Sequence, residues 1–455
     1  MKTKRNFFCI NVLWLLLIAT FSNLSFADGT GITAKGDIKK ILPMRERAKV
    51  MNDWLEWRLE NILPRLMRES GIDLWLIINR EYNEDAVYFT LAYQPTIYSY
   101  RTTILIFHDR GGELGVERLS ASDHPMSRWH KGVYTDRSKK QFENLAEVIK
   151  KIDPKKIGIN ISETWHLADG LNATMKKRLE KALGPELSKR LVSAEKLCID
   201  WLQIRSPQEL ETYKRICGIA HEIICEVSSD KVIKPDVTTV DDVRWWLRQR
   251  TIALGLQNWF FPICDVQRTT KDAEKYKENP EIIRRGDLVH CDLGVKYLGL
   301  VTDMQWHIYV CRENEDDAPE GLKKAFQKTL EFGKMLRGEF KEGRTGDEIA
   351  KAATEKAEAA GIKSRIYTHS IGTYGHSAGT RLDTRPLDEV AEGNRERTHY
   401  PIPLNTVYAI EYCCFFDIPE WDNQEVRMSF EDEAALTKDG CNFLDGHQEE
   451  FFLIK

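Results

Sequence analysis

Two aspartates lie eleven residues apart in an otherwise apolar stretch, LVHCDLGVKYLGLVTDMQW, which spans residues 288–306. Aspartate is a poor strand former and is costly to bury. If the stretch folds as a hairpin that turns at Tyr297 and Leu298, Asp292 and Asp303 lie directly opposite each other on one face. Two carboxylates held this close share either a proton or a cation. The pair therefore indicates a divalent metal site, and the alternative is two solvent-facing aspartates beside a loop.

Three further segments contain residues that could complete such a site. The glycine-rich loop THSIGTYGHSAGT, residues 368–380, holds His369 and His376, and its glycines let the backbone approach a ligand closely. Glu411 interrupts the apolar run NTVYAIEYCCFF, where an unpaired carboxylate would be expensive. The run VRMSFEDEAALT adds Glu431. Imidazole and carboxylate groups are both common metal ligands, so these six residues are candidates for one metal site.

The elements that must position these residues follow from periodicity and from turn and cap signals. A helical pattern from Arg45 to Ser70 is closed by Gly71. The buried strand IDLWLIIN follows, and TTILIFHD and KIGINIS are further strands that alternate with helical patterns. This alternation predicts an N-terminal α/β domain over residues 45–202.

The second domain, residues 203–455, is predicted to be α+β. Ser206 with Glu209, and Thr345 with Glu348, have the spacing of a capping box at the start of a helix. Two more helical patterns lie between them, one of which ends at Gly255. Four strand-like runs carry the acidic residues, at 288–296, 300–310, 405–416 and 426–437.

The first 27 residues have the pattern of a signal peptide. A basic start is followed by an apolar run from about Val12 to Ile18 and by small residues at Ser25 and Ala27. A retained membrane anchor is the alternative, but the apolar run is short for spanning a bilayer. We therefore expect cleavage after Ala27 and an exported protein, periplasmic or secreted, with no membrane association after cleavage.

Composition and charge exclude several classes of protein. The chain has 455 residues, of which 42% are hydrophobic and 30% charged, as in globular proteins and unlike disordered or collagen-like chains. Cleavage would remove three basic and no acidic residues, which changes the net charge from −4 to −7. An acidic chain gives no electrostatic reason to expect nucleic acid as a partner. None of the ten cysteines forms a CxxC pair, so a thiolate zinc site is not expected. The sequence is compatible with one disulfide but does not indicate which cysteines would form it.

The order and spacing of the five candidate ligands resemble the M24 metallopeptidase family of methionine aminopeptidase, aminopeptidase P, prolidase and creatinase. The matching motifs are VHCDLG, VTDM, GHSAG, VYAIEY and FEDEAALT, with Asp292, Asp303, His376, Glu411 and Glu431 at the ligand positions. The resemblance covers the chain after the signal peptide. It implies a creatinase-like N-terminal α/β domain and an α+β catalytic domain with the pita-bread fold.

The resemblance also implies a site for two divalent ions, with Mn²⁺ expected and zinc, cobalt or iron as alternatives. Asp292 would chelate one ion, Asp303 and Glu431 would bridge both, and His376 and Glu411 would bind the other. A bridging water would be activated to attack the peptide carbonyl, with Glu411 as the general base. Asp432 and Glu433 stay open as alternatives to Glu431, which is preferred because AALT aligns with the closing strand of the family.

The implied function is an exported, metal-dependent Xaa-Pro aminopeptidase or dipeptidase that acts on a peptide substrate. Relatives of this type are often homodimers. Two alternatives remain open at this point: a creatinase-like C–N hydrolase that acts on a small non-peptide substrate without metal, and a non-catalytic binding protein stabilised by metal.

The sequence departs from the family pattern around the metal ligands. The loop that precedes the first aspartate in active relatives carries a histidine, and residues 257–276 contain none. A second histidine shortly after the ligand is also missing, and the segment supplies Arg381, Asp383 and Arg385 instead. His369 is then the candidate for a catalytic proton donor or oxyanion partner, and its alternative role is a structural loop histidine.

Overall fold

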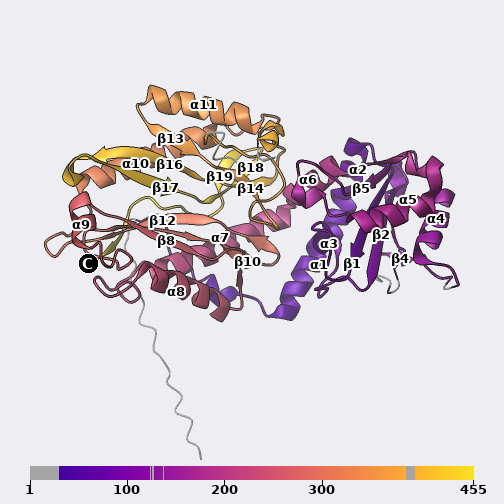
Figure 1. Cartoon of the computed structure of the whole chain (residues 1–455), viewed down its shortest axis with the longest axis horizontal. Coiled ribbons are helices and arrows are strands. Elements are labelled where there is room, and N and C mark those ends of the chain that lie inside the picture. The colour runs from indigo at the N-terminus through magenta and orange to yellow at the C-terminus, as the bar shows by residue number, and fades with distance from the viewer. Residues whose placement is uncertain (1–29, 123, 125–127, 137, 386–394) are drawn as a thin grey trace, which may run out of the picture.

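The computed structural model describes residues 30–455 except 123, 125–127, 137 and 386–394. The signal peptide predicted over residues 1–27 lies outside these described residues. Figure 1 shows two lobes side by side, an N-terminal lobe in indigo to magenta and a larger C-terminal lobe in magenta to yellow. Among the helices of the described residues, none has the length and apolarity needed to cross a membrane.

The N-terminal lobe is built on one six-stranded mixed sheet with the strand order β4-β3-β2-β1-β5-β6. Its strands are β1 (Leu74–Arg80), β2 (Thr102–Asp109), β3 (Val116–Ser120), β4 (Lys131–Gly132), β5 (Ile157–Ile159) and β6 (Leu191–Ser193). Its helices are α1 (Met44–Asn61), α2 (Leu63–Ser70), α3 (Tyr88–Leu91), α4 (Gln141–Ile152), α5 (Ala173–Ser188) and α6 (Glu195–Gln203). The alternation of strands and helices predicted from the sequence is therefore observed.

Strand β1 is buried on both faces, which is why it reads as an uninterrupted apolar run. Leu74 and Leu76 pack into the core shared with α4 and α5, whereas Trp75 and Ile77 pack with α2 and α6 on the other face. The helix predicted over residues 45–70 is divided at Ile62, because Pro64 stands in the first turn of α2 and cannot continue a helix interior.

The C-terminal lobe has five α-helices among its described residues. They are α7 (Pro207–Val227), α8 (Val240–Ala253), α9 (Thr270–Lys275), α10 (Glu320–Gly338) and α11 (Gly346–Ala359). The capping boxes predicted at Ser206 and Thr345 are both present. The boundary placed at residues 202 and 203 falls at the end of α6, just before α7 begins.

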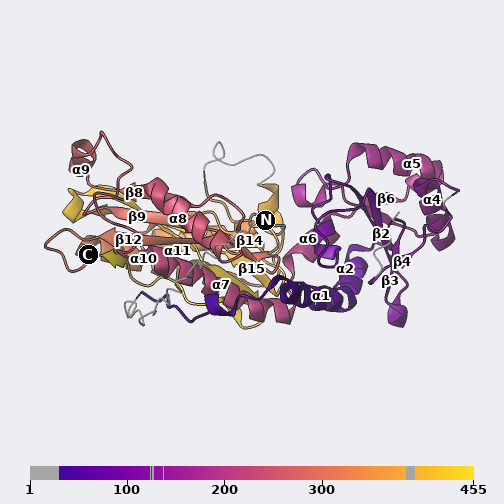
Figure 2. The ribbon, with the colours of Figure 1, turned by 90° about the horizontal axis from the view of Figure 1, so that it is seen from below.

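The strands of this lobe form four small sheets with the orders β11-β10-β7, β20-β12-β9-β8, β13-β16-β17 and β14-β15-β18-β19. The strands are β7 (Gln257–Asn258), β8 (Ile263–Gln267), β9 (Leu288–Leu293), β10 (Val295–Tyr297), β11 (Leu300–Val301), β12 (Met304–Val310), β13 (Lys363–Ile366), β14 (His369–Ile371), β15 (Thr406–Ala409), β16 (Tyr412–Ile418), β17 (Gln424–Phe430), β18 (Glu433–Thr437), β19 (Gly440–Phe443) and β20 (Phe452–Ile454). Helices α7 and α8 cover one side of these strands, and α10 and α11 cover the other (Figures 1 and 2).

Each long strand run predicted from the sequence is broken into two strands that belong to different sheets. The chain passes from β9 to β10, from β11 to β12, from β15 to β16 and from β17 to β18, and each passage changes sheet. The predicted acidic positions lie at or beside these breaks. A carboxylate is tolerated there because the backbone ladder is already interrupted and the side chain faces the junction between sheets.

The hairpin register differs from the one expected. Leu298 and Gly299 form the turn, both with positive φ, as a two-residue type I′ turn requires. The turn is therefore one residue later than the predicted Tyr297–Leu298 turn. Asp292 pairs with Gln305 rather than with Asp303. The two aspartates stay on the same face, but as diagonal neighbours, because Asp303 is two residues from Gln305.

Candidate metal centre

The five predicted ligands and His369 come together where the four small sheets meet. Asp292 lies near the end of β9, and Asp303 lies between β11 and β12. Glu411 separates β15 from β16, and Glu431 separates β17 from β18. His369 is the first residue of β14. Segments more than one hundred residues apart in the sequence thus contribute side chains to one junction.

The donor atoms fall into three overlapping groups in which all atoms lie within 4.8 Å of one another. The groups are Asp292 with Asp303 and Glu431, His369 with Glu411 and Glu431, and Asp303 with His369 and His376. Glu431 belongs to two groups, and so do Asp303 and His369. An arrangement of two adjacent donor sets with a shared carboxylate is suited to two neighbouring cations.

Unpartnered atoms at this junction test whether a cation fits. Among the described residues, Asp292 Oδ1, Glu431 Oε1 and His369 Nε2 are buried without a hydrogen-bond partner. His369 Nε2 lies 3.6 Å from Asp303 Oδ2 and 3.7 Å from Glu431 Oε1. Buried polar atoms without partners are costly. Asp292 shares one donor group with Glu431, and His369 shares another with Glu431, so divalent ions at these two groups would satisfy all three atoms. The residues therefore fit a metal.

The electrostatics of the metal-free cluster agree with this reading. Burial raises the pKa of Asp292 to about 7 and that of Glu411 to about 8. Burial, together with the neighbouring carboxylates, also raises the pKa of Asp303 and of Glu431 well above the ordinary range. Four carboxylates that repel one another in a low-dielectric junction need protons or cations.

The two histidines of the glycine-rich loop differ in their surroundings. His369 is 3% exposed, and its Nδ1 lies 3.2 Å from the carbonyl oxygen of Ser370. Because a carbonyl can only accept, Nδ1 carries the proton, and Nε2 presents a lone pair to the carboxylates. His376 is exposed on the loop, with its ring centroid 4.7 Å from that of His369. The structure thus places His369 deeper in the cluster than His376.

The three acidic residues at 431–433 take different positions. Asp432 accepts a hydrogen bond from His221 Nε2 at 3.0 Å. Glu433 accepts hydrogen bonds from the backbone N–H of Asp303 and, at 3.7 Å, from the thiol of Cys217. Of the three, Glu431 alone belongs to the donor groups among the described residues. Glu433 instead holds the backbone of Asp303 through the hydrogen bond from its N–H.

Trp259 stands close to the cluster in the loop where a histidine was expected. Its indole Nε1 donates to the carbonyl oxygen of Thr302 at 2.8 Å, and its ring lies 5.4 Å from that of His376. Two glycines make room for it, because a Cβ at Gly294 or Gly375 would lie 2.2 or 2.3 Å from atoms of the indole. The loop therefore presents an aromatic face to the site.

Arg381 and Arg385 enclose Tyr367 beside the cluster. Their guanidinium carbons lie 3.8 and 4.0 Å from the centre of the Tyr367 ring, and both bind Asp383. Tyr367 is adjacent to the metal cluster, since its backbone N–H donates to the carbonyl oxygen of Glu411 at 3.0 Å. The positive charges of the two arginines favour the ionised form of Glu411.

Sequence reasoning missed one contact of the site, Gln305. Its side-chain amide donates to Glu411 and Glu431 at 3.0 and 2.7 Å. A signal was available, because Gln305 follows Asp303 by two residues and therefore lies on the same face of the strand. A glutamine in a strand is common, however, and its type alone does not indicate a metal site.

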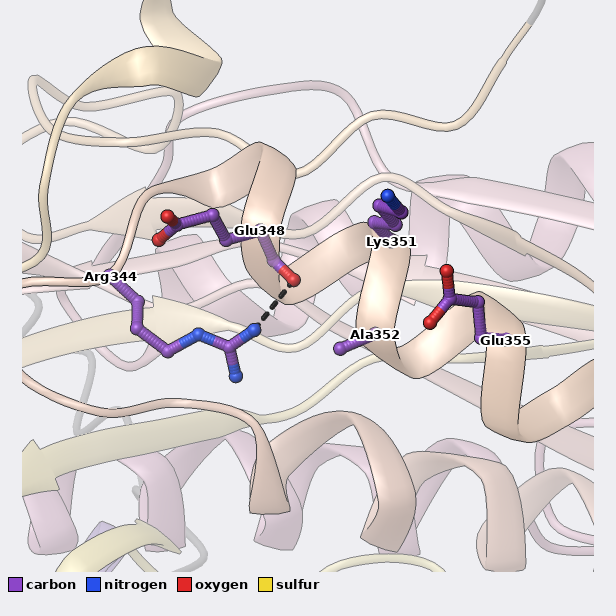
Figure 3. Close-up of a pocket in the computed structure, with 5 residues that line it drawn as sticks. All are labelled: Arg344, Glu348, Lys351, Ala352 and Glu355. Carbon is purple, nitrogen blue, oxygen red and sulfur yellow. Dashed lines mark hydrogen bonds between the residues drawn. The ribbon is translucent and has the colours of Figure 1, made fainter.

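A surface hollow on α11 lies outside this site. It is lined by Arg344, Glu348, Lys351, Ala352 and Glu355, and Arg344 donates to the backbone carbonyl oxygen of Glu348 (Figure 3). None of the donor residues lines the hollow, and its alternating charges neutralise one another. It therefore adds nothing to the candidate metal centre.

Comparison with known proteins supplies the family. Residues 211–438 match the model of metallopeptidase family M24. This matched segment includes all six donor residues. A Mycoplasma pneumoniae protein described as a Xaa-Pro aminopeptidase is 24% identical over 180 residues, which cover 40% of this chain and 48% of that protein. The chain thus spans about half the length of the curated relatives it matches.

Solved structures resemble the chain over most of its length. The X-Pro aminopeptidase of Thermotoga maritima resembles this chain with a TM-score of 0.60 at 17% identity. The match covers 86% of this chain and 99% of the Thermotoga chain. The Xaa-Pro dipeptidase of Bacillus anthracis has a TM-score of 0.57 at 16% identity, and the match covers 90% of this chain and 100% of the dipeptidase chain. At these identities the likeness shows the fold alone, which is the predicted combination of a creatinase-like α/β domain and a pita-bread domain.

Proposed function

The chain belongs to metallopeptidase family M24, and on this basis we propose that it is a metal-dependent hydrolase that releases N-terminal residues from Xaa-Pro peptides. The observation that carries the proposal is the pair of donor groups that share Glu431, one with Asp292 and Asp303 and the other with His369 and Glu411. Packing alone does not explain three buried carboxylates and a half-buried fourth at one junction, because buried acids are a poor way to stabilise a fold.

We propose one divalent ion in each donor group. Oxygen-rich ligation with one imidazole per pair of ions suits Mn²⁺, with zinc, cobalt or iron as alternatives. When bound, such ions lower the pKa of water and polarise the carbonyl of the scissile bond. Asp292, Asp303 and Glu431 would hold the first ion, and Glu431, Glu411 and His369 the second.

Glu411 is proposed to move the proton of the attacking water. Its Oε1 accepts a hydrogen bond from Gln305, which leaves Oε2 as the oxygen that receives a proton. Burial raises the pKa of Glu411 to about 8, and the positive charges of Arg381 and Arg385 oppose this rise and favour the ionised form that a general base needs. The exposed ring of His376 then lies where it can exchange a proton with a substrate or with solvent.

We propose that the two histidines exchange the roles that the sequence motifs suggested, with His369 as the ligand and His376 as the outer group. Replacing His369 with alanine is expected to weaken metal binding at least 10-fold, because Nε2 is a direct donor. Replacing His376 with alanine is expected to leave metal binding near the wild-type value and to lower kcat about 100-fold. Metal content and steady-state kinetics of both variants test this, and the opposite pattern would restore the motif-based assignment.

The proposed activity is tested with purified protein and Mn²⁺. Peptides of the form Xaa-Pro-Gly and dipeptides Xaa-Pro should lose their first residue, as followed by mass spectrometry, and matched Xaa-Ala peptides should be cleaved more slowly. Protein that binds metal and cleaves no peptide of the panel would contradict the proposal. Activity without stoichiometric metal would instead favour a metal-free C–N hydrolase.

A further inference from the structure

A chain of hydrogen bonds runs from the protein surface to the proposed metal ligands. Gln305 Nε2 donates to Glu411 Oε1 at 3.0 Å and to Glu431 Oε2 at 2.7 Å. Gln305 Oε1 lies 2.8 Å from His290 Nε2, and His290 Nδ1 lies 2.9 Å from Asp265 Oδ2. Asp265 is 42% exposed, whereas the histidine is buried. Three side chains from three strands therefore connect solvent to two carboxylates of the cluster.

The direction of these hydrogen bonds is fixed by the chemistry of the groups. Ionised carboxylates only accept, so the amide nitrogen of Gln305 must face Glu411 and Glu431 and its oxygen must face His290. The amide has two N–H groups, and each carboxylate takes one. His290 must then donate through Nε2, and the carboxylate of Asp265 binds the other ring nitrogen and holds the imidazole in this orientation.

The backbone holds Gln305 in place. Its N–H donates to the carbonyl oxygen of Glu431 at 3.1 Å, and in the β9–β12 ladder it pairs with Asp292. One residue therefore contacts three of the acidic positions. Its amide binds one oxygen of Glu431 and leaves the other, Oε1, without a partner and facing His369.

We propose that Gln305 is a positioning residue of the metal centre, which orients Glu411 and Glu431, and that His290 and Asp265 hold its amide in the required direction. This inference rests on the proposed metal centre and goes beyond it, because neither the family match nor the ligand motifs assign a role to these three residues. Groups that hydrogen-bond to ligating carboxylates orient them and tune the affinity for metal.

The test measures metal affinity directly, without a peptide substrate. Mn²⁺ is titrated into metal-free protein in competition with a chelator, and Co²⁺ absorption reports the geometry of coordination. Gln305→Ala is expected to bind Mn²⁺ about 10- to 100-fold more weakly than the wild type and to change the Co²⁺ spectrum. His290→Phe, which keeps the volume and removes the donor, should give a smaller loss of the same kind.

Two further variants separate orientation from packing. Gln305→Met keeps the length of the side chain but lacks the N–H groups, so it should bind Mn²⁺ no better than Gln305→Ala. Gln448→Ala removes a different buried amide, which binds the backbone of His307, and should leave the affinity for Mn²⁺ within about 2-fold of the wild type. Wild-type affinity in Gln305→Ala, full recovery in Gln305→Met, or an equal loss in Gln448→Ala would each overturn the proposal.

The outcome is independent of whether the peptidase proposal holds. If the wild type binds metal but cleaves no peptide, and Gln305→Ala still weakens metal binding, the positioning role stands and the proposed activity falls. If the wild type cleaves Xaa-Pro peptides and Gln305→Ala binds Mn²⁺ as tightly as the wild type, the activity stands and the positioning role falls.

Discussion

Replacing Glu411 with glutamine is expected to lower kcat for Xaa-Pro peptides by about 10²- to 10⁴-fold, which is the contribution typical of a general base. Glutamine keeps the shape of the side chain but cannot take a proton, and it offers a weaker oxygen ligand. KM should change much less than kcat, because the loss falls on the chemical step. Steady-state kinetics with Mn²⁺ at saturating concentration measure both quantities.

The control for this variant is Glu425→Gln, a change of the same chemistry on the exposed part of β17. Glu425 forms a surface ion pair with Lys363 at 2.6 Å, and exposed pairs of this kind contribute little. Its kinetics should therefore match those of the wild type. A Glu411→Gln variant that retains metal and turns over within 5-fold of the wild-type rate would exclude Glu411 as the base.

Asp292, Asp303 and Glu411 stand out in the sequence because each of them interrupts an apolar run, whereas Glu431 was preferred over its acidic neighbours because AALT resembles the closing strand of the family. Asp292 stands in the otherwise hydrophobic strand β9 and Glu411 between the apolar strands β15 and β16, and the cost of burying an unpaired carboxylate makes such residues conspicuous. The hairpin expected over residues 288–306 predicted that the two aspartates share a face. The predicted pairing of Asp292 with Asp303 was wrong, because the turn falls at Leu298–Gly299, one residue later than expected, and Asp292 therefore pairs with Gln305.

The histidines could not be separated by sequence reasoning alone. Both lie in one glycine-rich loop, and the motif GHSAG favoured His376. The structure distinguishes them by burial and by the hydrogen bond that fixes the tautomer of His369, neither of which has a local sequence signal. Trp259 was equally hidden, because its position depends on the small residues Gly294 and Gly375 in two distant segments.

Gln305 shows a more general limit of sequence reasoning. Its role depends on contacts with Glu411 and Glu431, which lie more than one hundred residues later and reach it only because their strands change sheets at the junction. The sequence predicted long continuous strands and therefore gave no reason for four sheets to meet. The breaks create the site, since a carboxylate within a continuous ladder would point into a packed face instead.

Removal of metal is expected to destabilise the protein more at high pH than at low pH. In the metal-free protein, burial raises the pKa of Asp292 to about 7 and that of Glu411 to about 8, above their values in the unfolded chain. A carboxyl group with a raised pKa stabilises the fold while it is protonated, and this stability is lost as pH rises through the folded-state pKa. Each such group contributes up to about 1.4 kcal/mol per pH unit between the two pKa values.

Bound metal should weaken this dependence of stability on pH, because it binds the ionised carboxylates and competes with protons for them. With chelator present, Tm should therefore fall between about pH 4.5 and pH 8, and with excess Mn²⁺ the fall should be small or absent. Thermal unfolding at matched ionic strength measures both curves. In Glu411→Gln one ionisable group is gone, so the slope of the metal-free curve should decrease. Parallel curves with and without Mn²⁺ would mean that the carboxylates at this junction do not hold the metal, since ligands that exchange protons for cations must link stability to both.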